Sequence, residues 1–236
     1  MSDTVYYAIG DVHGEIGKLE TLLNHIREDA RMFAAAYKIV FLGDLIDRGP
    51  DSRAVVAHAM SAERAGDAIV LKGNHEELML HAYANRDSIS IYHWAENGGD
   101  ETIAAYKAAN GEADDWRDAV DADHLHFLRS LKVTHHDEAR GLVFVHAGID
   151  PKVFPLCTDE LRMWTRSEKF YDHRRWPERP ELDGIMVIHG HTPTSDFAPD
   201  LNPRRINVDT GACFGGPLTC AVLAPNERPR FLVSRS

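Results

Sequence analysis

Five short segments of this chain, each containing glycine, carry the side chains best suited to chemistry. They supply aspartate, histidine, asparagine and arginine next to glycines that let backbone and ligand approach closely. Carboxylate, imidazole and amide groups in such a set are typical of a site for a pair of divalent metal ions. The set points to hydrolysis of a phosphate ester. In chain order the segments are Gly10-Asp11-Val12-His13-Gly14, Gly43-Asp44-Leu45-Ile46-Asp47-Arg48-Gly49, Gly73-Asn74-His75-Glu76, His146-Ala147-Gly148 and Gly190-His191-Thr192.

Hydrolysis of a phosphate ester needs a neutralised phosphate, a nucleophile at neutral pH and a proton for the leaving oxygen. Two divalent ions ~3.5–4 Å apart meet the first two needs, because they clamp the phosphoryl oxygens and lower the pKa of a bound water toward ~7. Asp11 and His13 follow a predicted strand at alternate positions, so extended backbone would aim both at one ion. Asp44 is the natural bridging carboxylate. Neutral donors to the second ion are Asn74, His146 and His191.

The donor types favour some metals over others. Carboxylate, imidazole, amide and water ligands suit manganese, iron or zinc more than copper or calcium, and no thiolate belongs to the set. We expect two divalent ions, with Mn²⁺ as first choice and iron or zinc as alternatives. His189 is an alternative ligand to His191, one glycine away. We favour His191, on the expectation that only one of two such strand positions faces the site.

Proton transfer and phosphate binding need further side chains. His75 directly follows a candidate ligand and should overhang the site without binding metal, so we expect it to be the general acid for a leaving alkoxide. Asp47 is expected to hold it as an imidazolium through the other ring nitrogen, which would raise the pKa of His75. Arg48 offers a planar fork for two phosphate oxygens. As the second arginine we choose Arg166, in Trp164-Thr165-Arg166.

The order and spacing of the first three segments resemble those of the phosphoprotein phosphatase family of metallophosphoesterases. The match is most similar to the bacterial and phage branch typified by lambda phosphatase, and it covers most of the chain. The resemblance implies an α/β fold of two mixed β-sheets packed face to face as a sandwich, flanked by helices, with a dinuclear metal site at the strand ends. Further similar segments are His93-Trp94, Asn97-Gly98-Gly99, Trp164-Thr165-Arg166, Gly190-His191-Thr192-Pro193 and Asp209-Thr210-Gly211-Ala212.

The resemblance also implies a role for each candidate residue. Asp47 and His75 would form the proton-donating pair, and Arg48 and Arg166 would bind phosphate. Asp44 would bridge the two ions. The implied ligands are Asp11, His13 and Asp44 for the first ion, and Asp44, Asn74, His146 and His191 for the second.

The activity implied by the resemblance is dephosphorylation of phosphoserine and phosphothreonine, and also of phosphotyrosine, in a phosphoprotein or phosphopeptide by direct attack of metal-bound water or hydroxide. The rival activity is hydrolysis of bis(5'-nucleosyl) tetraphosphates, because a related bacterial branch shares the strand motifs and a tail like residues 209–220. That branch typically lacks an acid at the position of Asp47 and has aspartate at that of Glu76, which favours the monoesterase. A non-catalytic phosphoprotein-binding module is a third hypothesis, but such a module would normally have lost a ligand or the proton donor.

Three early apolar runs each end at one of the glycine-containing segments. Residues 5–9, 39–42 and 68–71 are predicted strands, and apolar residues at helical spacing follow in 16–26 and 52–64. Strands that alternate with helices predict a parallel sheet, whose ligands lie beyond the carboxyl ends of its strands. The candidate ligands fall at those ends.

The rest of the chain changes character at about residue 142. Residues 77–131 are predicted to be mostly helical, and we expect their acidic run, residues 112–123, to be a solvated helix face. Residues 168–183 are rich in charge and proline and predict a long surface loop. A second sheet is expected from five segments, residues 142–145, 185–188, 206–208, 218–223 and 231–233.

Composition limits the remaining possibilities. The length suits one domain over residues 1–236, because single cores grow to roughly 250 residues. A net charge of -11 argues against nucleic acid and anionic membranes as partners. Three cysteines without disulfide or zinc spacing, and no signal peptide or membrane span, predict a cytoplasmic protein. Lys72 and Ala147 depart from the eukaryotic family members and fit a bacterial origin. The oligomeric state stays open.

Overall fold

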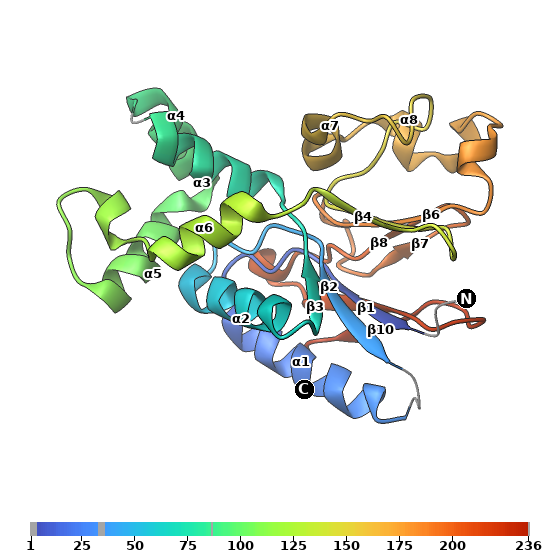
Figure 1. Ribbon diagram of the computed structural model, residues 1–236, viewed down its shortest axis with the longest axis horizontal. Helices are drawn as coiled ribbons and strands as arrows, with labels where there is room; N and C mark the ends of the chain where they lie inside the picture. Colours follow the sequence, from blue (N-terminus) through green and yellow to red (C-terminus); the bar gives the residue numbers. More distant parts are fainter. Residues whose placement is uncertain (1–3, 33–35, 86, 236) are drawn as a thin grey trace.

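A computed structural model of the protein describes residues 4–32, 36–85 and 87–235. The described strands form two five-stranded sheets that lie face to face, with helices on the outer side of each (Figure 1). This confirms the expected fold class. The helices are α1 (Ile16–Ala30), α2 (Ser52–Arg64), α3 (Asn74–Asn85), α4 (Ser88–Trp94), α5 (Asp100–Asn110), α6 (Ala122–Ser130), α7 (Asp159–Trp164) and α8 (Glu168–Tyr171). The strands are β1 (Val5–Ile9), β2 (Tyr37–Phe41), β3 (Ala68–Val70), β4 (Thr134–Asp137), β5 (Leu142–Val145), β6 (Met186–His189), β7 (Asp200–Leu201), β8 (Arg205–Asn207), β9 (Thr219–Leu223) and β10 (Arg230–Val233).

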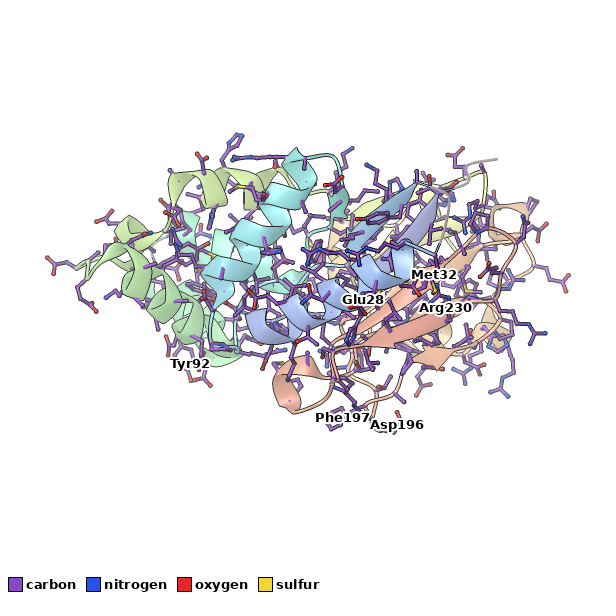
Figure 2. The ribbon with its side chains drawn as sticks, turned by 90° about the horizontal axis from the view of Figure 1, so that it is seen from below. Glu28, Met32, Tyr92, Asp196, Phe197 and Arg230 are labelled. Carbon is purple, nitrogen blue, oxygen red and sulfur yellow. The ribbon has the colours of Figure 1, made fainter. Side chains whose placement is uncertain are left out.

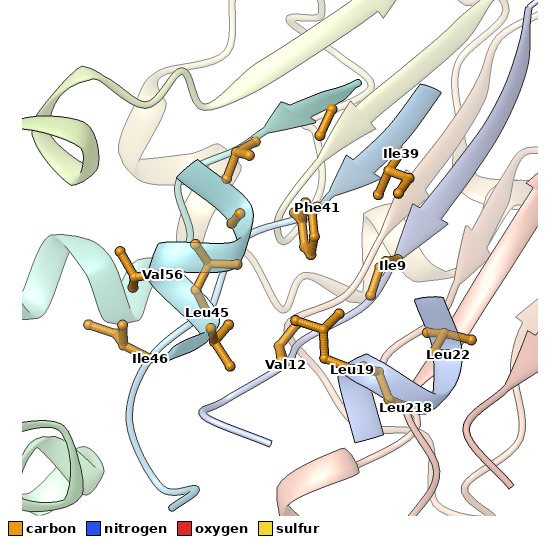
Figure 3. Close-up of a cluster of buried hydrophobic side chains, with 14 of the residues drawn as sticks. Ile9, Val12, Leu19, Leu22, Ile39, Phe41, Leu45, Ile46, Val56 and Leu218 are labelled. Atoms are coloured by element: carbon orange, nitrogen blue, oxygen red, sulfur yellow. The ribbon is translucent and has the colours of Figure 1, made fainter. Parts of the chain in front are cut away.

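The first sheet has the order β10-β9-β1-β2-β3, with β1, β2 and β3 parallel to one another. Side chains of β1 alternate: Tyr7 and Ile9 pack with α1 and α2, whereas Tyr6 and Ala8 face the second sheet. Apolar residues at helical spacing give α1 and α2 the faces that cover this sheet. Figure 3 shows part of this core, where the labelled helix and loop residues are Val12, Leu19, Leu22, Leu45, Ile46, Val56 and Leu218.

The second sheet has the order β4-β5-β6-β8-β7, and its central strands β5, β6 and β8 are parallel. Phe144 and Ile188 point toward the first sheet and form the core between the sheets. Val143 and Val187 point the other way and pack against Phe170 of α8. Asp44, which follows β2, lies 3.3 Å from His146, which follows β5, so the carboxyl ends of parallel strands from both sheets meet in one region.

Helices α3 to α6 form a lobe beside the sheets, at the left in Figure 1. Trp94 and Phe127 of this lobe join the core of the first sheet. The expected acidic helix face at residues 112–123 is wrong for most of its length, because residues 112–121 form a loop and a short 3-10 helix and only Asp123 of the acidic residues lies in an α-helix, α6. Asp121 instead accepts a 2.7 Å hydrogen bond from Arg53 of α2, which ties this loop to the sheet-covering helices. Within the described residues, no helix has the length and apolar character needed to cross a membrane.

Two other expectations about the second half of the chain are wrong. Strands β9 and β10 do not join the second sheet; β9 pairs antiparallel with β1 and completes the first. Residues 168–183 are not a surface loop only, because Phe170, Trp176 and Leu182 are buried in the core outside the second sheet. Strand β4 was not expected, since its polar sequence lacks apolar alternation. That the whole chain forms one domain stays a prediction.

Candidate metal centre

The first three glycine-containing segments follow the carboxyl ends of β1, β2 and β3. The N–H of His13 donates to Asp44 O at 2.9 Å, which joins the first two of these loops. His13 has a φ of 46°, so the extended backbone expected between Asp11 and His13 is wrong. Asp44, Asp47 and Arg48 are also left-handed, with φ of 49°, 74° and 69°. Such conformations are costly outside glycine and persist where surrounding structure enforces them, commonly at functional sites.

Glu76 ties the second and third loops together from inside the protein. Its carboxylate is buried and accepts hydrogen bonds from the N–H groups of Asp44, Leu45 and Gly73, at 2.9, 2.7 and 2.7 Å. These bonds satisfy three buried donors that would otherwise lack partners. A Cβ at Gly73 would collide with the Asp44 carboxylate, so glycine is required there. Glu76 and Gly73 thus fix the position of Asp44.

Asp44 lies between two groups of candidate ligands. Its Oδ2 is 3.3 Å from His146 Nε2, 3.6 Å from His13 Nε2 and 3.9 Å from His75 Nε2. One group consists of His13, Asp44 and His75, and the other of Asp44, His146 and His191; all are buried. Each group brings its ligand atoms close enough to hold an ion. The shared carboxylate agrees with the bridging position expected of Asp44.

In the group of Asp44, His146 and His191, the side-chain nitrogen and oxygen atoms lie close together. His146 Nδ1 bonds to Leu42 O at 3.0 Å, so its Nε2 faces Asn74 Oδ1 at 2.9 Å. His191 Nδ1 lies 2.8 Å from the same Asn74 oxygen. Burial opposes a charge on His146, but Asp44 outweighs it and raises the pKa of His146 to about 9. The site therefore demands a positive charge, and oxygen and nitrogen donors around it fit a divalent cation.

Asp11 meets a second carboxylate that the sequence analysis did not assign to the site. Both oxygens of Asp11 accept the N–H of His191 at 3.1 Å. Its carboxyl lies close to that of Asp209, and burial raises the pKa of Asp209 to about 6. Burial, with Asp209 next in effect, raises the pKa of Asp11 well above its usual value. Two buried carboxyls in contact need a shared proton or a cation, so positive charge fits here as well. The role of Asp11 as a ligand stays a prediction.

The Asp47–His75 pair forms as expected. His75 Nδ1 lies 2.7 Å from Asp47 Oδ2, and Asp47 is held by Trp94 Nε1 and Thr102 Oγ1, which donate to it at 3.0 and 2.7 Å. The expected rise in the pKa of His75 is wrong, because burial lowers it to about 4 despite the charge of Asp44. Burial also raises the pKa of Asp47 well above its usual value. Lost hydration thus favours the neutral form of both partners.

Two arginines reach the site, each beside a different ligand group. Arg48 Nη1 donates to His13 Nε2 at 2.8 Å, and Arg166 Nε donates to His191 Nε2 at 3.1 Å. Burial lowers the pKa of His13 to about 3, so its Nε2 keeps the lone pair that accepts this bond. A Cβ at Gly98 would lie 2.6 Å from Arg48 Cγ, which explains the glycine at this position. Both arginines that we expect to bind phosphate therefore lie beside candidate metal ligands.

The alternative ligand His189 lies outside the two groups. Its ring packs against Phe170 and Tyr171, with centroids 5.0 and 5.6 Å away, and its Nδ1 bonds to Gly190 O. The preference for His191 agrees with this geometry, but the reason given for it is wrong, since alternate residues of one strand face the same side. Strand β6 ends at His189, and His191 turns toward the site with a φ of 71°.

Comparison with known proteins identifies the family. The family model for calcineurin-like phosphoesterases matches residues 5–227, a span that contains every segment of the site. The chain belongs to the calcineurin-like phosphoesterase family. Hydrolysis of phosphoesters and a dinuclear site for divalent metals go with this family, and the ligand groups that share Asp44 fit such a site.

The relatives of this calcineurin-like phosphoesterase include named tetraphosphatases. The asymmetrical bis(5'-nucleosyl)-tetraphosphatase PrpE of Anoxybacillus flavithermus is 26% identical over 228 residues, which cover 91% of this chain and 89% of the relative. The symmetrical bis(5'-nucleosyl)-tetraphosphatase of Cellvibrio japonicus is 33% identical over 169 residues, 70% of this chain and 54% of the relative. Since these relatives are not phosphatases of the lambda branch, the wider family is established and the branch is not.

A solved structure with the same fold carries a different name. The cold-active protein-tyrosine phosphatase of a psychrophilic Shewanella species aligns with a TM-score of 0.60 over 98% of this chain and 82% of its own. The two chains are 20% identical, so this likeness shows the fold alone.

Sequence reasoning missed three residues that position the site of this phosphoesterase. Asp209 follows the predicted strand 206–208, and that signal could have found it, since Asp11 follows β1 in the same way. Glu76 was noted as part of a motif but not as the carboxylate that joins two loops. Thr102 lies inside α5 and contacts Asp47 only because the chain folds back, so no local pattern marks it.

Proposed function

We propose that the protein is a metal-dependent hydrolase of bis(5'-nucleosyl) tetraphosphates. The observation that carries this proposal is the similarity to the Anoxybacillus flavithermus tetraphosphatase, which extends over nearly the whole of both chains. The site supports it, because arginines stand beside both ligand groups and suit a substrate with several phosphates. Mn²⁺ is our first choice of metal, since the donors are oxygen and nitrogen atoms.

The chain's own residues would divide the work as follows. Arg48 and Arg166 would hold phosphate oxygens from two sides with their planar guanidinium groups. Two divalent ions bound around Asp44 would neutralise phosphate charge. They would also lower the pKa of water, so that hydroxide is available at neutral pH to attack phosphorus. The leaving group is a nucleoside phosphate, which is a weak base and needs little help from a proton donor.

A second candidate function is dephosphorylation of phosphoserine and phosphothreonine in proteins. The observation that favours it is the Asp47–His75 pair, which is buried and hydrogen-bonded at 2.7 Å. A serine or threonine alkoxide is a strong base, so its departure depends on a positioned proton donor in a way that cleavage of a phosphoanhydride does not. The pair would be essential for such monoesters.

One of the two residues that favoured the monoesterase has another explanation. Glu76 accepts three backbone N–H groups and joins two loops, so its identity serves the architecture of the site rather than the choice of substrate. Asp47 remains the residue that supports the second candidate.

The test is a direct comparison of substrates with the purified protein and added Mn²⁺. Diadenosine tetraphosphate, a phosphoserine peptide and p-nitrophenyl phosphate are compared by kcat/KM. We expect the highest value for diadenosine tetraphosphate. A phosphopeptide that is turned over faster would overturn the proposal in favour of the second candidate.

The variant His75→Asn separates the two functions further. For a substrate with an alkoxide leaving group, its kcat should fall about 10²–10⁴-fold, the usual contribution of a positioned acid. For diadenosine tetraphosphate the fall should be clearly smaller. Equal losses for both substrates would contradict the role of His75 as a proton donor. The exposed pair Arg64–Asp123 offers a matched control, Asp123→Asn, which should leave both rates unchanged.

A further inference from the structure

Phe214 is an exposed aromatic side chain beside one of the arginines of the site. More than half of its accessible surface, 55%, is open to solvent, although side chains of this size usually bury most of theirs. The guanidinium carbon of Arg48 lies over the ring, 5.4 Å from its centroid. The same guanidinium donates to His13 in the first ligand group. Phe214 is therefore separated from the metal centre by one side chain that can hold phosphate.

The segment Gly211–Gly216 holds this ring in a fixed place. Phe214 ends a short 3-10 helix, Ala212–Phe214, which is enclosed by left-handed glycines at 211 and 215, with φ of 67° and 92°. The N–H groups of Phe214 and Gly216 both donate to Gly211 O at 2.9 Å. A Cβ at Gly216 would collide with the backbone of Thr210. Because the backbone of this turn is already fixed, ligand binding costs little additional conformational entropy.

A second aromatic residue, Phe197, packs on the backbone of the turn. A Cβ at Gly211 would lie 2.7 Å from the ring of Phe197, so this ring packs directly on the backbone of the turn. Figure 2 shows Phe197 next to the short helix that carries Phe214, at the surface of the molecule. Hydrogen bonds within the turn and the contact with Phe197 thus hold its backbone, while the ring of Phe214 stays open to solvent.

Trp164 is another exposed aromatic residue at the site, but its position is explained. Its ring stands edge-on to His191, with centroids 6.3 Å apart, so it helps to hold a candidate ligand. By contrast, Phe214 makes no ring contact with a candidate ligand histidine in the part of the chain that the structure describes. An open aromatic ring beside a phosphate-binding arginine is the arrangement that recognises a nucleotide, because every nucleobase has a flat face that stacks on an aromatic ring.

We propose that Phe214 is a stacking platform for one nucleobase of the substrate, with Arg48 holding the phosphates attached to that nucleoside. This inference rests on the proposed function and names the residue that would distinguish a nucleotide from a phosphoprotein. Stacking is tolerant of base identity, so the platform accepts any nucleobase and does not read hydrogen bonds on the base edge.

The test measures binding, which does not depend on turnover. Isothermal titration of the Mn²⁺-loaded protein compares ADP with pyrophosphate, two ligands with the same number of phosphates. The wild-type protein should bind ADP more tightly than pyrophosphate. Phe214→Ala and Phe214→Leu should lose about tenfold or more in ADP affinity and keep their affinity for pyrophosphate. Phe214→Tyr should keep the preference, because it keeps the aromatic faces.

A matched control comes from an exposed aromatic residue elsewhere. Tyr92 on α4 is 64% exposed and stands apart from Phe197 in Figure 2. Tyr92→Ala should bind both ligands as the wild-type protein does. An unchanged preference for ADP in Phe214→Leu, with a normal melting temperature, would overturn the platform while leaving the proposed function intact. A wild-type protein that binds ADP through Phe214 but does not cleave diadenosine tetraphosphate would keep the platform and overturn the proposed function.

Discussion

The two halves of the metal centre are held by different means. The half on the first sheet carries Asp44 and Asn74, and its loops are joined by a carboxylate close in sequence, Glu76, which binds backbone N–H groups of both. The half on the second sheet carries His146 and His191. These are attached across the interface between the sheets, where His146 bonds to Leu42 O and the N–H of His191 bonds to Asp11.

This difference teaches which part of the site depends on which part of the fold. The first half is encoded locally, since strand, loop and helix follow one another and the carboxylate that joins the loops belongs to the third of them. The second half exists only when the two sheets are packed, because its connections run between residues far apart in the chain. The effect of a substitution on metal binding and stability should therefore depend on the half of the site in which the residue lies.

The largest effect is expected at the residue that both halves share. Asp44→Asn removes the carboxylate that faces His13 and His146. Both ions should bind poorly, and kcat/KM should fall by more than about 10³-fold, beyond the loss caused by removing one stabilising group. The bound metal is counted by elemental analysis after dialysis against Mn²⁺. Retention of one full equivalent of metal would contradict a shared bridging position.

The next largest effect, a loss of stability, is expected from a substitution in the first half. Glu76→Ala leaves three buried N–H groups without a partner, each costing about 1–3 kcal/mol. The free energy of unfolding should fall by at least about 3 kcal/mol in urea titrations. Glu77, a half-exposed neighbour paired with Lys72, gives the matched control Glu77→Ala, which should change stability little. A stable Glu76→Ala protein would refute the local coupling of the loops.

A smaller and more selective effect is expected in the second half. Asp209→Asn replaces a carboxyl that contacts Asp11 with an amide of the same shape. Groups that orient a ligand typically contribute about 10–100-fold to metal affinity, so one of two Mn²⁺ ions should bind more weakly by that factor. Titration calorimetry resolves the two ions. Equal weakening of both ions would mean that Asp209 acts on the whole site and not through Asp11.

The smallest effect lies outside both halves. Arg230 of β10 donates to both oxygens of Asp29 at 2.6 Å, and Tyr7 donates at 2.7 Å. Burial opposes ionisation of Asp29, but these hydrogen bonds outweigh it and hold its pKa below the usual value. Asp29→Asn should cost about 1–2 kcal/mol at neutral pH and leave metal binding unchanged.

The pH dependence of that cost follows from the direction of the shift. An acid whose pKa is lower in the folded state stabilises the fold above its unfolded pKa of about 3.9, and this contribution is lost as the pH falls through the folded value. The difference in stability between wild type and Asp29→Asn should therefore be constant from neutral pH to about 5 and shrink in more acid solution. A difference that grows in acid would contradict the ion pair.

The elements of the first sheet and its helices could be read from the sequence because their signals are local. Predicted strand 5–9 and helix 52–64 agree with β1 and α2, and Asp44, Asn74 and His75 fall where strand ends were expected. The assignment of 218–223 to the second sheet failed, because sequence shows that a strand exists but not which strand it pairs with. The acidic run at 112–123 misled because a charged segment can as well be a loop that pairs with a distant arginine, as Asp121 does with Arg53.

The candidate site was predictable in its residue types and less so in its details. Aspartates, histidines and glycines in order are visible in the printed chain, whereas the left-handed turns that aim His13 and His191 are properties of the fold. The pKa of His75 was predicted in the wrong direction because burial, which depends on the whole molecule, outweighs one neighbouring carboxylate. Thr102 gains its importance from a contact with Asp47 across the chain, which no spacing reveals, whereas Asp209 follows a predicted strand as Asp11 does.

The return of β9 to the first sheet also affects how the protein can be made. Strand β1 leaves the ribosome well before its second neighbour, β9, and the N–H of Gly10 donates to Thr219 O at 3.1 Å in the folded protein. Until residues 219–223 emerge, the nascent chain carries an unpaired strand edge of the kind that invites aggregation. The early β1–β2–β3 region can assemble during synthesis, but Gly10, next to Asp11, gains this hydrogen-bond partner only after residue 219 has been translated.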